Sequence, residues 1–325
     1  MADTETPVVA ALAAVDMGSN SFRLEVGSLQ QGRYRRVDDL RETVRLGAGL
    51  NADGELSEEA IERGLACLHR FAARLSGFAP AQVRAVATQT LRQAHNRDSF
   101  LLPAQAVLGF PIEVISGQEE ARLIYAGVTR LQPSDEARLV VDVGGRSTEL
   151  ILGQGHTPRA AESFAVGSVG LSMRYFGDGR FSAAAFHDAQ QAAGAVFEPA
   201  LQTFARRHWQ QALGSSGTAG AVSALLQAHG QGDGGITPAG LRWCIERCIA
   251  AGHVDRLDLA RLKPERRPVI GGGLAILSAL TAQFGIDRLM PAKGALRQGV
   301  IVDLHQRLQA QPLVVCGDLH NGAAA

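Results

Sequence analysis

The sequence has no long apolar run and no excess of charge of either sign. None of its apolar runs approaches the roughly 20 residues that a membrane-spanning helix requires, and no signal peptide is recognisable before Asp16. Lys and Arg together number 32, as do Asp and Glu, so no general attraction to nucleic acid or to a membrane surface is expected. Any anion-binding site must therefore be local.

Cysteine is also scarce, and its spacing matches no metal site. The chain contains four cysteines, namely Cys67, Cys244, Cys248 and Cys316. Cys244 and Cys248 are better explained as one face of a helix than as a redox pair. The 325 residues are 46% hydrophobic, which allows a large core and favours two domains over one. These features predict a soluble protein of the cytoplasm, a reducing compartment.

Residues 140–152, VVDVGGRSTELIL, combine an apolar run, a small turn and a second apolar run. The first run carries Asp142 towards the turn at 144–147, and the second carries Glu149 away from it. Glycines allow backbone N–H groups to approach an anion closely, and Asp142 would lie beside a bound phosphate, where a hydrated divalent cation needs a carboxylate. An ordinary hairpin turn explains the local pattern equally well.

A second copy of this pattern near the N-terminus favours the anion-binding interpretation. Residues 15–27 (VDMGSNSFRLEVG) align without a gap with residues 141–153 (VDVGGRSTELILG), which places Asp16 on Asp142. Two strand–Asp–turn–strand units in one chain suggest duplicated halves that face each other across a cleft. A hairpin that only reversed the chain would not require an Asp twice.

Apolar periodicity predicts strands and helices along the rest of the chain. Strands are expected at about 9–16, 22–26, 83–87, 111–115, 162–167 and 287–290, besides the two runs of 140–152. Helices are expected after the N-cap residues Ser57, Ser116, Ser182 and Thr237, and also at 222–226, 274–284 and 295–308. The polar segment 132–135 is expected to cross between two domains.

Some side chains are predicted to be buried or solvated from their alternation. Arg23 and Glu25 alternate with apolar residues, which predicts a strand with one solvated face. In the strand and loop that follow, the inward residues are expected to be Tyr34, Val37 and Val44.

Several polar residues have two interpretations on local sequence. Ser116 and Glu119 form a capping box, so Glu120 is left either to stabilise the helix dipole or to serve a function. Arg92 is either a surface cation or a phosphate clamp. The segment 214–218, GSSGT, is either a plain strand-to-helix connection or an anion site at a helix N-terminus.

Six motifs follow one another along the chain: VDMGSNSFRLEV, VATQTLRQA, VISGQEEARLIYAGV, VVDVGGRSTELILG, GSSGT and GALRQGV. Together they resemble the exopolyphosphatase/guanosine-pentaphosphate phosphatase family, within the superfamily of actin, Hsp70 and the sugar kinases, over about residues 11–308. The resemblance implies an α/β fold of two ribonuclease-H-like (actin-like) domains, with mixed sheets flanked by helices and the active site in the interdomain cleft. The domains would span 1–130 and 131–310, with the last helix, about 295–310, packing back onto the first.

The resemblance also implies magnesium-dependent hydrolysis of the terminal phosphate of inorganic polyphosphate, with manganese as the alternative ion. Glu120 would activate the attacking water, and its pKa should then be raised by partial burial and neighbouring carboxylates. Glu149 would be a second catalytic acid and, with Asp16 and Asp142, a metal ligand. The implied phosphate- or substrate-binding residues are Ser19, Asn20, Ser21, Arg92, Gly144, Gly145, Arg146, Ser147, Ser216, Gly217 and Thr218.

The chain departs from the family pattern in two ways. The family's central turn usually reads Gly-Gly-Gly-Ser, and Arg146 replaces the third glycine. Arg146 would therefore either change the turn or add a direct phosphate contact. The chain also stops soon after the last expected helix, whereas long family members carry a further helical region, so short polyphosphates are the expected substrates.

Three functions are compatible with these motifs. The first is exopolyphosphatase, and the second is guanosine pentaphosphate 5'-phosphohydrolase, which would need a guanosine pocket. The third is an ATP-dependent kinase or ATPase with Gly271–Gly273 near an adenosine, although these glycines could equally let a helix pack closely. A phosphate-sensing module without turnover is the non-enzymatic alternative. Polyphosphate or guanosine pentaphosphate is the expected partner, with no nucleic acid and no membrane, and a homodimer is expected.

Overall fold

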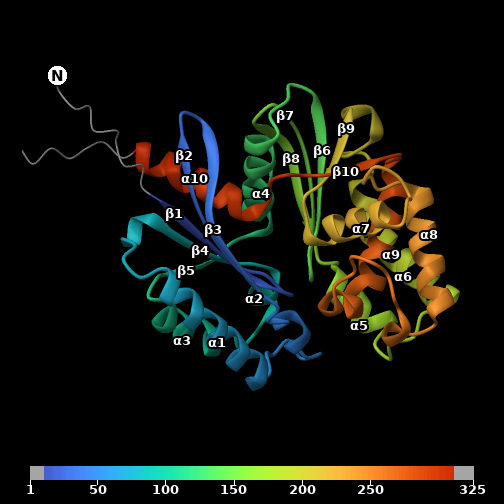
Figure 1. The fold of residues 1–325 in the computed structure, drawn as a ribbon, viewed down its shortest axis with the longest axis horizontal. Coiled ribbons are helices and arrows are strands. Elements are labelled where there is room, and N and C mark those ends of the chain that lie inside the picture. Colours follow the sequence, from blue (N-terminus) through green and yellow to red (C-terminus); the bar gives the residue numbers. More distant parts are fainter. Residues whose placement is uncertain (1–10, 311–325) are drawn as a thin grey trace, which may run out of the picture.

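The computed structural model describes residues 11–310 and contains two α/β halves side by side (Figure 1). The first sheet has the order β3-β2-β1-β4-β5, and its strands are β1 (Leu12–Met17), β2 (Phe22–Gln30), β3 (Arg33–Glu42), β4 (Val83–Ala87) and β5 (Ile112–Val114). The second has the order β8-β7-β6-β9-β10, and its strands are β6 (Ala137–Val143), β7 (Thr148–Gln154), β8 (Thr157–Phe164), β9 (Gln211–Gly214) and β10 (Leu289–Pro291). In both sheets three antiparallel strands continue into parallel ones. This matching order confirms the predicted pair of mixed sheets.

Helices flank both sheets (Figure 1). Those before the second sheet are α1 (Glu58–Arg74), α2 (Gln89–Gln93), α3 (Asp98–Leu108) and α4 (Gly117–Leu131). Those after β8 are α5 (Ser168–Tyr175), α6 (Ala183–Phe197), α7 (Gly217–Ala228), α8 (Pro238–Ala251), α9 (Arg267–Phe284) and α10 (Leu296–Ala310). The N-caps expected at Ser57, Ser116, Ser182 and Thr237 are confirmed, because each side chain accepts a hydrogen bond from the first turn of its helix. None of the helices within residues 11–310 is long and apolar enough to cross a membrane.

The two halves are joined beside α4 and α10. The chain passes from the first half to the second between Leu131 and Ala137, and returns between Pro291 and Leu296. α10 then packs against α4, β1 and β2. A shared apolar core on this side includes Val86 of β4, Ile124 of α4, Val140 of β6 and Val300 of α10. Each half also has an apolar core of its own.

Two predictions about single residues and one about the start of a strand are wrong. Glu25 is fully buried, because donors from α10 and β3 surround its carboxylate. Val37 is 59% exposed, since it lies on the edge strand β3. β8 begins at Thr157, before the expected 162, because Gly155 adopts a φ of 55° in a tight turn directly after β7.

Cys244 and Cys248 lie on one face of a helix, as predicted. Cys244 and Cys248 are both buried on α8, and Cys67 is buried on α1. Burial raises the pKa of the Cys244 and Cys248 thiols to about 12. Cys316 lies outside the described residues.

Candidate active site

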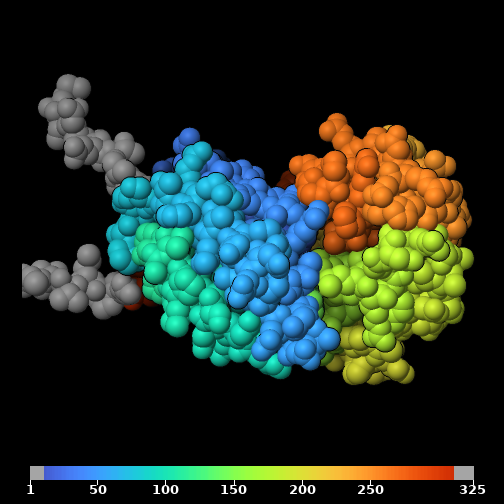
Figure 2. Space-filling model, turned by 90° about the horizontal axis from the view of Figure 1, so that it is seen from below, coloured from blue at the N-terminus to red at the C-terminus, as the bar shows by residue number. Residues whose placement is uncertain are grey.

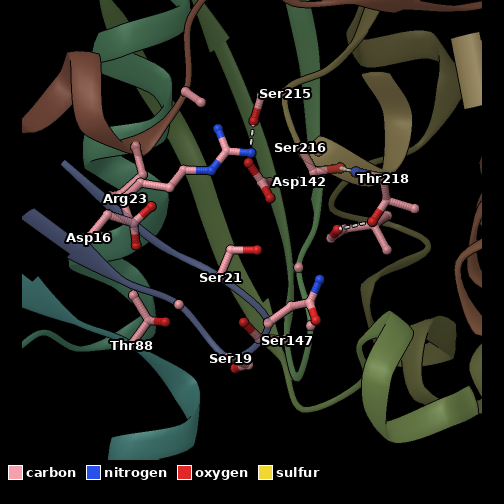
Figure 3. Close-up of a pocket in the computed structure, with 18 of the residues that line it drawn as sticks. Asp16, Ser19, Ser21, Arg23, Thr88, Asp142, Ser147, Ser215, Ser216 and Thr218 are labelled. Carbon is pink, nitrogen blue, oxygen red and sulfur yellow. Dashed lines mark hydrogen bonds between the residues drawn. The ribbon is translucent and has the colours of Figure 1, made fainter. Parts of the chain in front are cut away.

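A cavity of about 150 Å³ lies between the two halves, where the ends of β1 and β6 face each other (Figure 3). Asp16 comes from β1 and Asp142 from β6. The turns that follow these strands, 18–21 and 144–147, both contribute to the wall. Further parts of the wall come from the N-terminus of α7, from α4, and from the segment that leads into α10. Residues that are far apart in sequence therefore meet at one polar cavity.

The two hairpins have the same strand register. Asp16 is opposite Arg23 in the β1–β2 register, and Asp142 is opposite Glu149 in the β6–β7 register. In the second turn, the Gly144 N–H donates to the Ser147 carbonyl at 2.9 Å. A methyl group on Gly144 would lie 3.0 Å from that carbonyl oxygen, and one on Gly18 would lie 3.1 Å from the Ser21 carbonyl. Both turns are therefore tight, as the alignment of the two motifs indicated.

The segment 214–218 completes the second wall. The Ser215 hydroxyl donates to Asp142, and the Thr218 hydroxyl donates to the Val143 carbonyl at 2.8 Å. Ser216 caps α7. The free N–H groups in the first turn of this helix point towards its N-terminus, which lines the cavity. A methyl group on Gly217 would lie 2.3 Å from Arg266 Nη2, so a guanidinium packs directly on this backbone. Backbone N–H groups and a cation together suit an anion at this helix end.

Glu120 lies in the first turn of α4 and lines the cavity. Its pKa is raised to about 7, first by burial and then by the nearby carboxylates of Asp142 and Asp16. Arg92 opposes this shift, because its Nη1 donates to Glu120 Oε2 at 2.8 Å. A carboxyl group with this pKa can accept a proton near neutral pH, which is the property required of a general base.

Three further carboxyl groups lie near Glu120. Burial raises the pKa of Asp16, and it raises the pKa of Asp142 to about 6 despite the hydrogen bond from Ser215. Glu149 is only 1% exposed, and its Oε1 accepts a hydrogen bond from the Ser163 hydroxyl at 2.8 Å. Its pKa is well above the usual range because of burial, followed by the charges of Glu120 and Asp142. Glu149 is thus placed behind the cavity wall.

The donor atoms fit a hydrated magnesium ion. Within residues 11–310, no three His, Cys, Asp or Glu side chains converge closely enough to hold a metal ion by themselves. Magnesium does not require such a set, because it keeps several waters and takes one or two carboxylates together with substrate phosphates. Asp16 and Asp142 are the carboxylates, one from each half, that line the cavity beside Glu120.

Sequence reasoning missed three arginines that line the cavity: Arg23, Arg266 and Arg297. The pKa of Arg23 is lowered to about 9 by burial and then by the charges of Arg297 and Arg41. The pKa of Arg266 is lowered to about 10 by burial and by Arg41. These cations repel one another, and a bound polyanion would relieve the repulsion. Arg23 and Arg297 lie within two of the quoted motifs, VDMGSNSFRLEV and GALRQGV, so a signal for them was present.

Most of the residues implied by the resemblance meet at the cavity, whereas Glu149, Arg92 and Arg146 do not line it. Those that line it are Asp16, Ser19, Asn20, Ser21, Glu120, Asp142, Gly144, Gly145, Ser147, Ser216, Gly217 and Thr218. Arg92 lies behind Glu120, where it also donates to Gln89 and to the Ile115 carbonyl. The Arg146 side chain does not line the cavity. Its guanidinium reaches the first half and donates to the Gly47 carbonyl. The Arg146 side chain therefore takes part in a contact between the halves.

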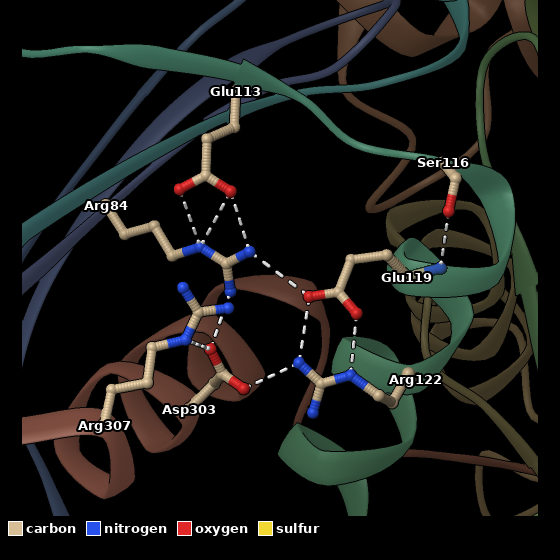
Figure 4. Close-up of polar contacts among 7 residues, drawn as sticks. All are labelled: Arg84, Glu113, Ser116, Glu119, Arg122, Asp303 and Arg307. Atoms are coloured by element: carbon tan, nitrogen blue, oxygen red, sulfur yellow. Dashed lines mark hydrogen bonds and ion pairs between the residues drawn. The ribbon is translucent and has the colours of Figure 1, made fainter. Parts of the chain in front are cut away.

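Glu119 forms only half of the expected capping box, and its carboxylate takes part in a network of arginines instead (Figure 4). The Glu119 N–H donates to Ser116 Oγ at 3.1 Å, but its carboxylate accepts from Arg122 and from the buried Arg84 of β4. Arg84 and Arg122 both also donate to Asp303 of α10, at 2.8 and 2.6 Å. This network anchors the turn of α4 that carries Glu120, and so fixes where the carboxyl group enters the cavity.

Comparisons with known proteins agree with this geometry. The Ppx/GppA phosphatase family matches residues 26–308. A Haemophilus influenzae protein, provisionally named an exopolyphosphatase, is 41% identical over 298 residues, which cover 92% of each chain.

Solved structures show the same fold. An exopolyphosphatase from Cytophaga hutchinsonii superposes with a TM-score of 0.81 at 22% identity, over 91% of this chain and 98% of its own. The Aquifex aeolicus Ppx/GppA family member superposes with a TM-score of 0.75 at 24% identity, over 93% of this chain and 100% of its own. The chain belongs to the Ppx/GppA phosphatase family and is, as the sequence predicted, a hydrolase that acts on phosphoanhydride bonds.

Proposed function

We propose that the protein is an exopolyphosphatase that uses magnesium to hydrolyse the terminal phosphate of inorganic polyphosphate, with a preference for short chains. The observation that carries this proposal is the position of Glu120, a carboxyl group with a pKa of about 7, in a cavity framed by two tight glycine-containing turns. The name of the Haemophilus influenzae relative supports the same activity.

The residues of the cavity account for the parts of the reaction. Phosphoryl transfer needs a positioned nucleophile and stabilisation of the phosphoryl oxygens more than it needs covalent chemistry. Glu120 would accept a proton from water as the water oxygen bonds to the terminal phosphorus and the bond to the bridging oxygen breaks. The turns 18–21 and 144–147 would bind the terminal phosphoryl oxygens, and Arg23, Arg266 and Arg297 would bind the phosphates behind it. Magnesium held by Asp16 and Asp142 would neutralise phosphate charge.

The lining favours polyphosphate over guanosine pentaphosphate. Within the described residues, the cavity wall contains no aromatic side chain, and its apolar members are Ile124, Val143, Ala295 and Leu296. A purine is usually held by a larger apolar or aromatic surface, and its pocket commonly exceeds about 300 Å³. A small cavity lined by arginines, serines and glycines is better suited to phosphate groups alone.

The geometry argues against the kinase alternative at Gly271–Gly273. These glycines lie inside α9, which begins at Arg267 and not at the expected 274. A methyl group on Gly272 would lie 2.4 Å from the Ser168 carbonyl of α5, and one on Gly271 would lie 2.8 Å from the Phe176 ring. The glycines therefore let α9 pack closely on α5, which leaves no room for an adenosine at that position.

The test is phosphate release by the wild-type protein from short-chain polyphosphate, guanosine pentaphosphate and ATP, each with magnesium, with manganese and with a chelator. We expect polyphosphate with magnesium to be the fastest and the chelator to abolish release. Faster hydrolysis of guanosine pentaphosphate would contradict the choice of substrate, and release only with ATP would contradict the proposal as a whole. A cytoplasmic location and a homodimer stay predictions, the second open to analytical ultracentrifugation.

A further inference from the structure

The two halves touch on both sides of the cavity, but both chain crossings lie on one side. The crossings, 131–137 and 291–296, lie beside α4 and α10, where the shared apolar core covers the contact. On the other side, the 3₁₀ turn Leu46–Gly49 of the first half, η1, meets α5 of the second. Figure 2 views the molecule from below, and shows the blue part of the first half against the yellow-green part of the second half. If the halves move apart about their joined side, the contact between η1 and α5 is the one that parts.

On the same side of the cavity, Arg146 of the turn 144–147 supplies the hydrogen bonds between the loop 45–50 and the second half. Its Nε donates to the Gly47 carbonyl at 3.0 Å, and its Nη2 donates to the Leu50 carbonyl at 3.2 Å. Within residues 11–310, the hydrogen bonds between the loop 45–50 and the second half all come from this side chain. Its stem also packs there, because a methyl group on Gly47 would lie 3.1 Å from Arg146 Cγ.

The peptide groups of Gly47 link the two phosphate-binding turns. The Gly47 N–H donates to the Ser19 carbonyl of the first turn at 2.7 Å, while its carbonyl accepts from Arg146 of the second turn. The turns also approach each other directly, since a methyl group on Gly145 would lie 2.9 Å from Ser19 Cβ. The two turns are therefore joined both by direct contact and by a short path from Ser19 through Gly47 to Arg146.

We propose that Arg146 is a positioning residue that holds the two halves closed at the cavity and so sets the distance between the turns 18–21 and 144–147. The effect of Arg146 on turnover rests on the proposed function of these turns, whereas its effect on closure does not. Without Arg146, the halves separate more readily, and a terminal phosphate bound to one turn is less well aligned with the other and with Glu120. Arg146 acts through the backbone of Gly47 and Leu50 and does not touch the substrate.

Two variants and a matched control test the proposal. Arg146→Met keeps much of the apolar stem and removes every donor, and Arg146→Lys keeps the charge without the planar fork. Arg63→Met is the control, because Arg63 Nε donates to the Val44 carbonyl at 3.0 Å, which is the same kind of bond within one half. Circular dichroism and thermal unfolding establish that each variant is folded.

The first measurement is the distance between spin labels by pulsed electron resonance in the full chain. The labels are placed at Glu59→Cys on α1 and Asp188→Cys on α6, two exposed positions on opposite halves, with Cys316 replaced by Ser. We expect a longer and broader distance for Arg146→Met, an intermediate one for Arg146→Lys, and the wild-type distance for Arg63→Met. A wild-type distance in Arg146→Met, or an equal change in Arg63→Met, overturns the proposal.

The second measurement is kcat and KM for short-chain polyphosphate. We expect kcat/KM to fall about tenfold in Arg146→Met, with part of it restored in Arg146→Lys, because misplacement of about 1 Å is costly in positioned reactions. If wild type hydrolyses no polyphosphate, the proposed function fails while the distance measurement still decides closure. If wild type is active and Arg146→Met matches it in both distance and kcat, the role of Arg146 fails alone.

Discussion

The two hairpins that frame the cavity have the same strand register but differ in charge at one equivalent position. Asp16 is opposite Arg23 in the first hairpin, and Asp142 is opposite Glu149 in the second. Arg23 lines the cavity, whereas Glu149 is buried behind it and bonded to Ser163. Each half therefore offers one acid and one turn, but the first half adds a cation for a polyanion, and the second adds a buried carboxyl group close to Glu120 and Asp142. The pKa of Glu149 is well above its usual range because of burial, followed by the charges of Glu120 and Asp142.

The shared acids give the largest expected effect. Asp142→Asn should lower kcat/KM for polyphosphate with magnesium by about 100-fold or more, because it removes one of the two carboxylates proposed to hold the metal. Asp16→Asn should do the same if the halves contribute equally. Phosphate release as a function of magnesium concentration measures both. Full activity of Asp16→Asn would show that the first half does not share this role.

The differing position should give a smaller effect of another kind. Arg23→Ala should raise KM for polyphosphate about tenfold and change kcat less, because a charge-assisted hydrogen bond to phosphate contributes about 1.5–3 kcal/mol. Arg35→Ala is the matched control, because Arg35 is an exposed arginine on β3. An equal change in both variants would mean that general charge, and not the cavity, governs binding.

The pH dependence separates Glu120 from the acids of the hairpins. Activity should rise with pH through about 7, as Glu120 loses its proton and becomes able to accept one from water. Arg92 favours the charged carboxylate, so Arg92→Gln should move this rise to higher pH. The pH profile of kcat/KM measures the shift, and a profile that moves to lower pH would contradict the account.

A smaller effect concerns stability. The folded-state pKa of Glu120 lies above its unfolded value, so its contribution to stability is present at low pH and is lost as pH rises through about 7. Glu120→Gln should therefore have a higher Tm than wild type at pH 8 and a similar Tm at pH 4. Thermal unfolding at the two pH values checks this. A lower Tm of Glu120→Gln than of wild type at pH 8 would contradict the claim that the charged carboxylate of Glu120 is unfavourable.

The fold could be predicted because its signals are local and repeated. The paired strand–Asp–turn–strand motifs and the capping residues fixed the order of elements before any contact was known. Helix α3 was missed, since Pro103 inside it and the lack of a capping side chain at Arg97 remove the usual helix signals. The start of α9 was also missed, because Gly271–Gly273 are poor helix formers that are retained for packing against α5.

The site could be predicted in part for the same reason. Motif residues such as Ser19 and Gly144 line the cavity, because turns directly after paired strands have few conformations available. The position of Arg146 could not be foreseen, since its partners Gly47 and Leu50 carry no sequence signal for a carbonyl that accepts a hydrogen bond from the other half. Long-range contacts of neutral backbone groups are set by tertiary packing alone.

The most direct measurement compares Glu120→Gln with Glu62→Gln, an exposed glutamate on α1, for phosphate release from short-chain polyphosphate and for polyphosphate binding. We expect Glu120→Gln to bind polyphosphate but to release phosphate at least about 100-fold more slowly, because general base catalysis contributes about 10² to 10⁴ in rate. Glu62→Gln should match wild type in both measurements. Turnover by Glu120→Gln at the wild-type rate would contradict the account.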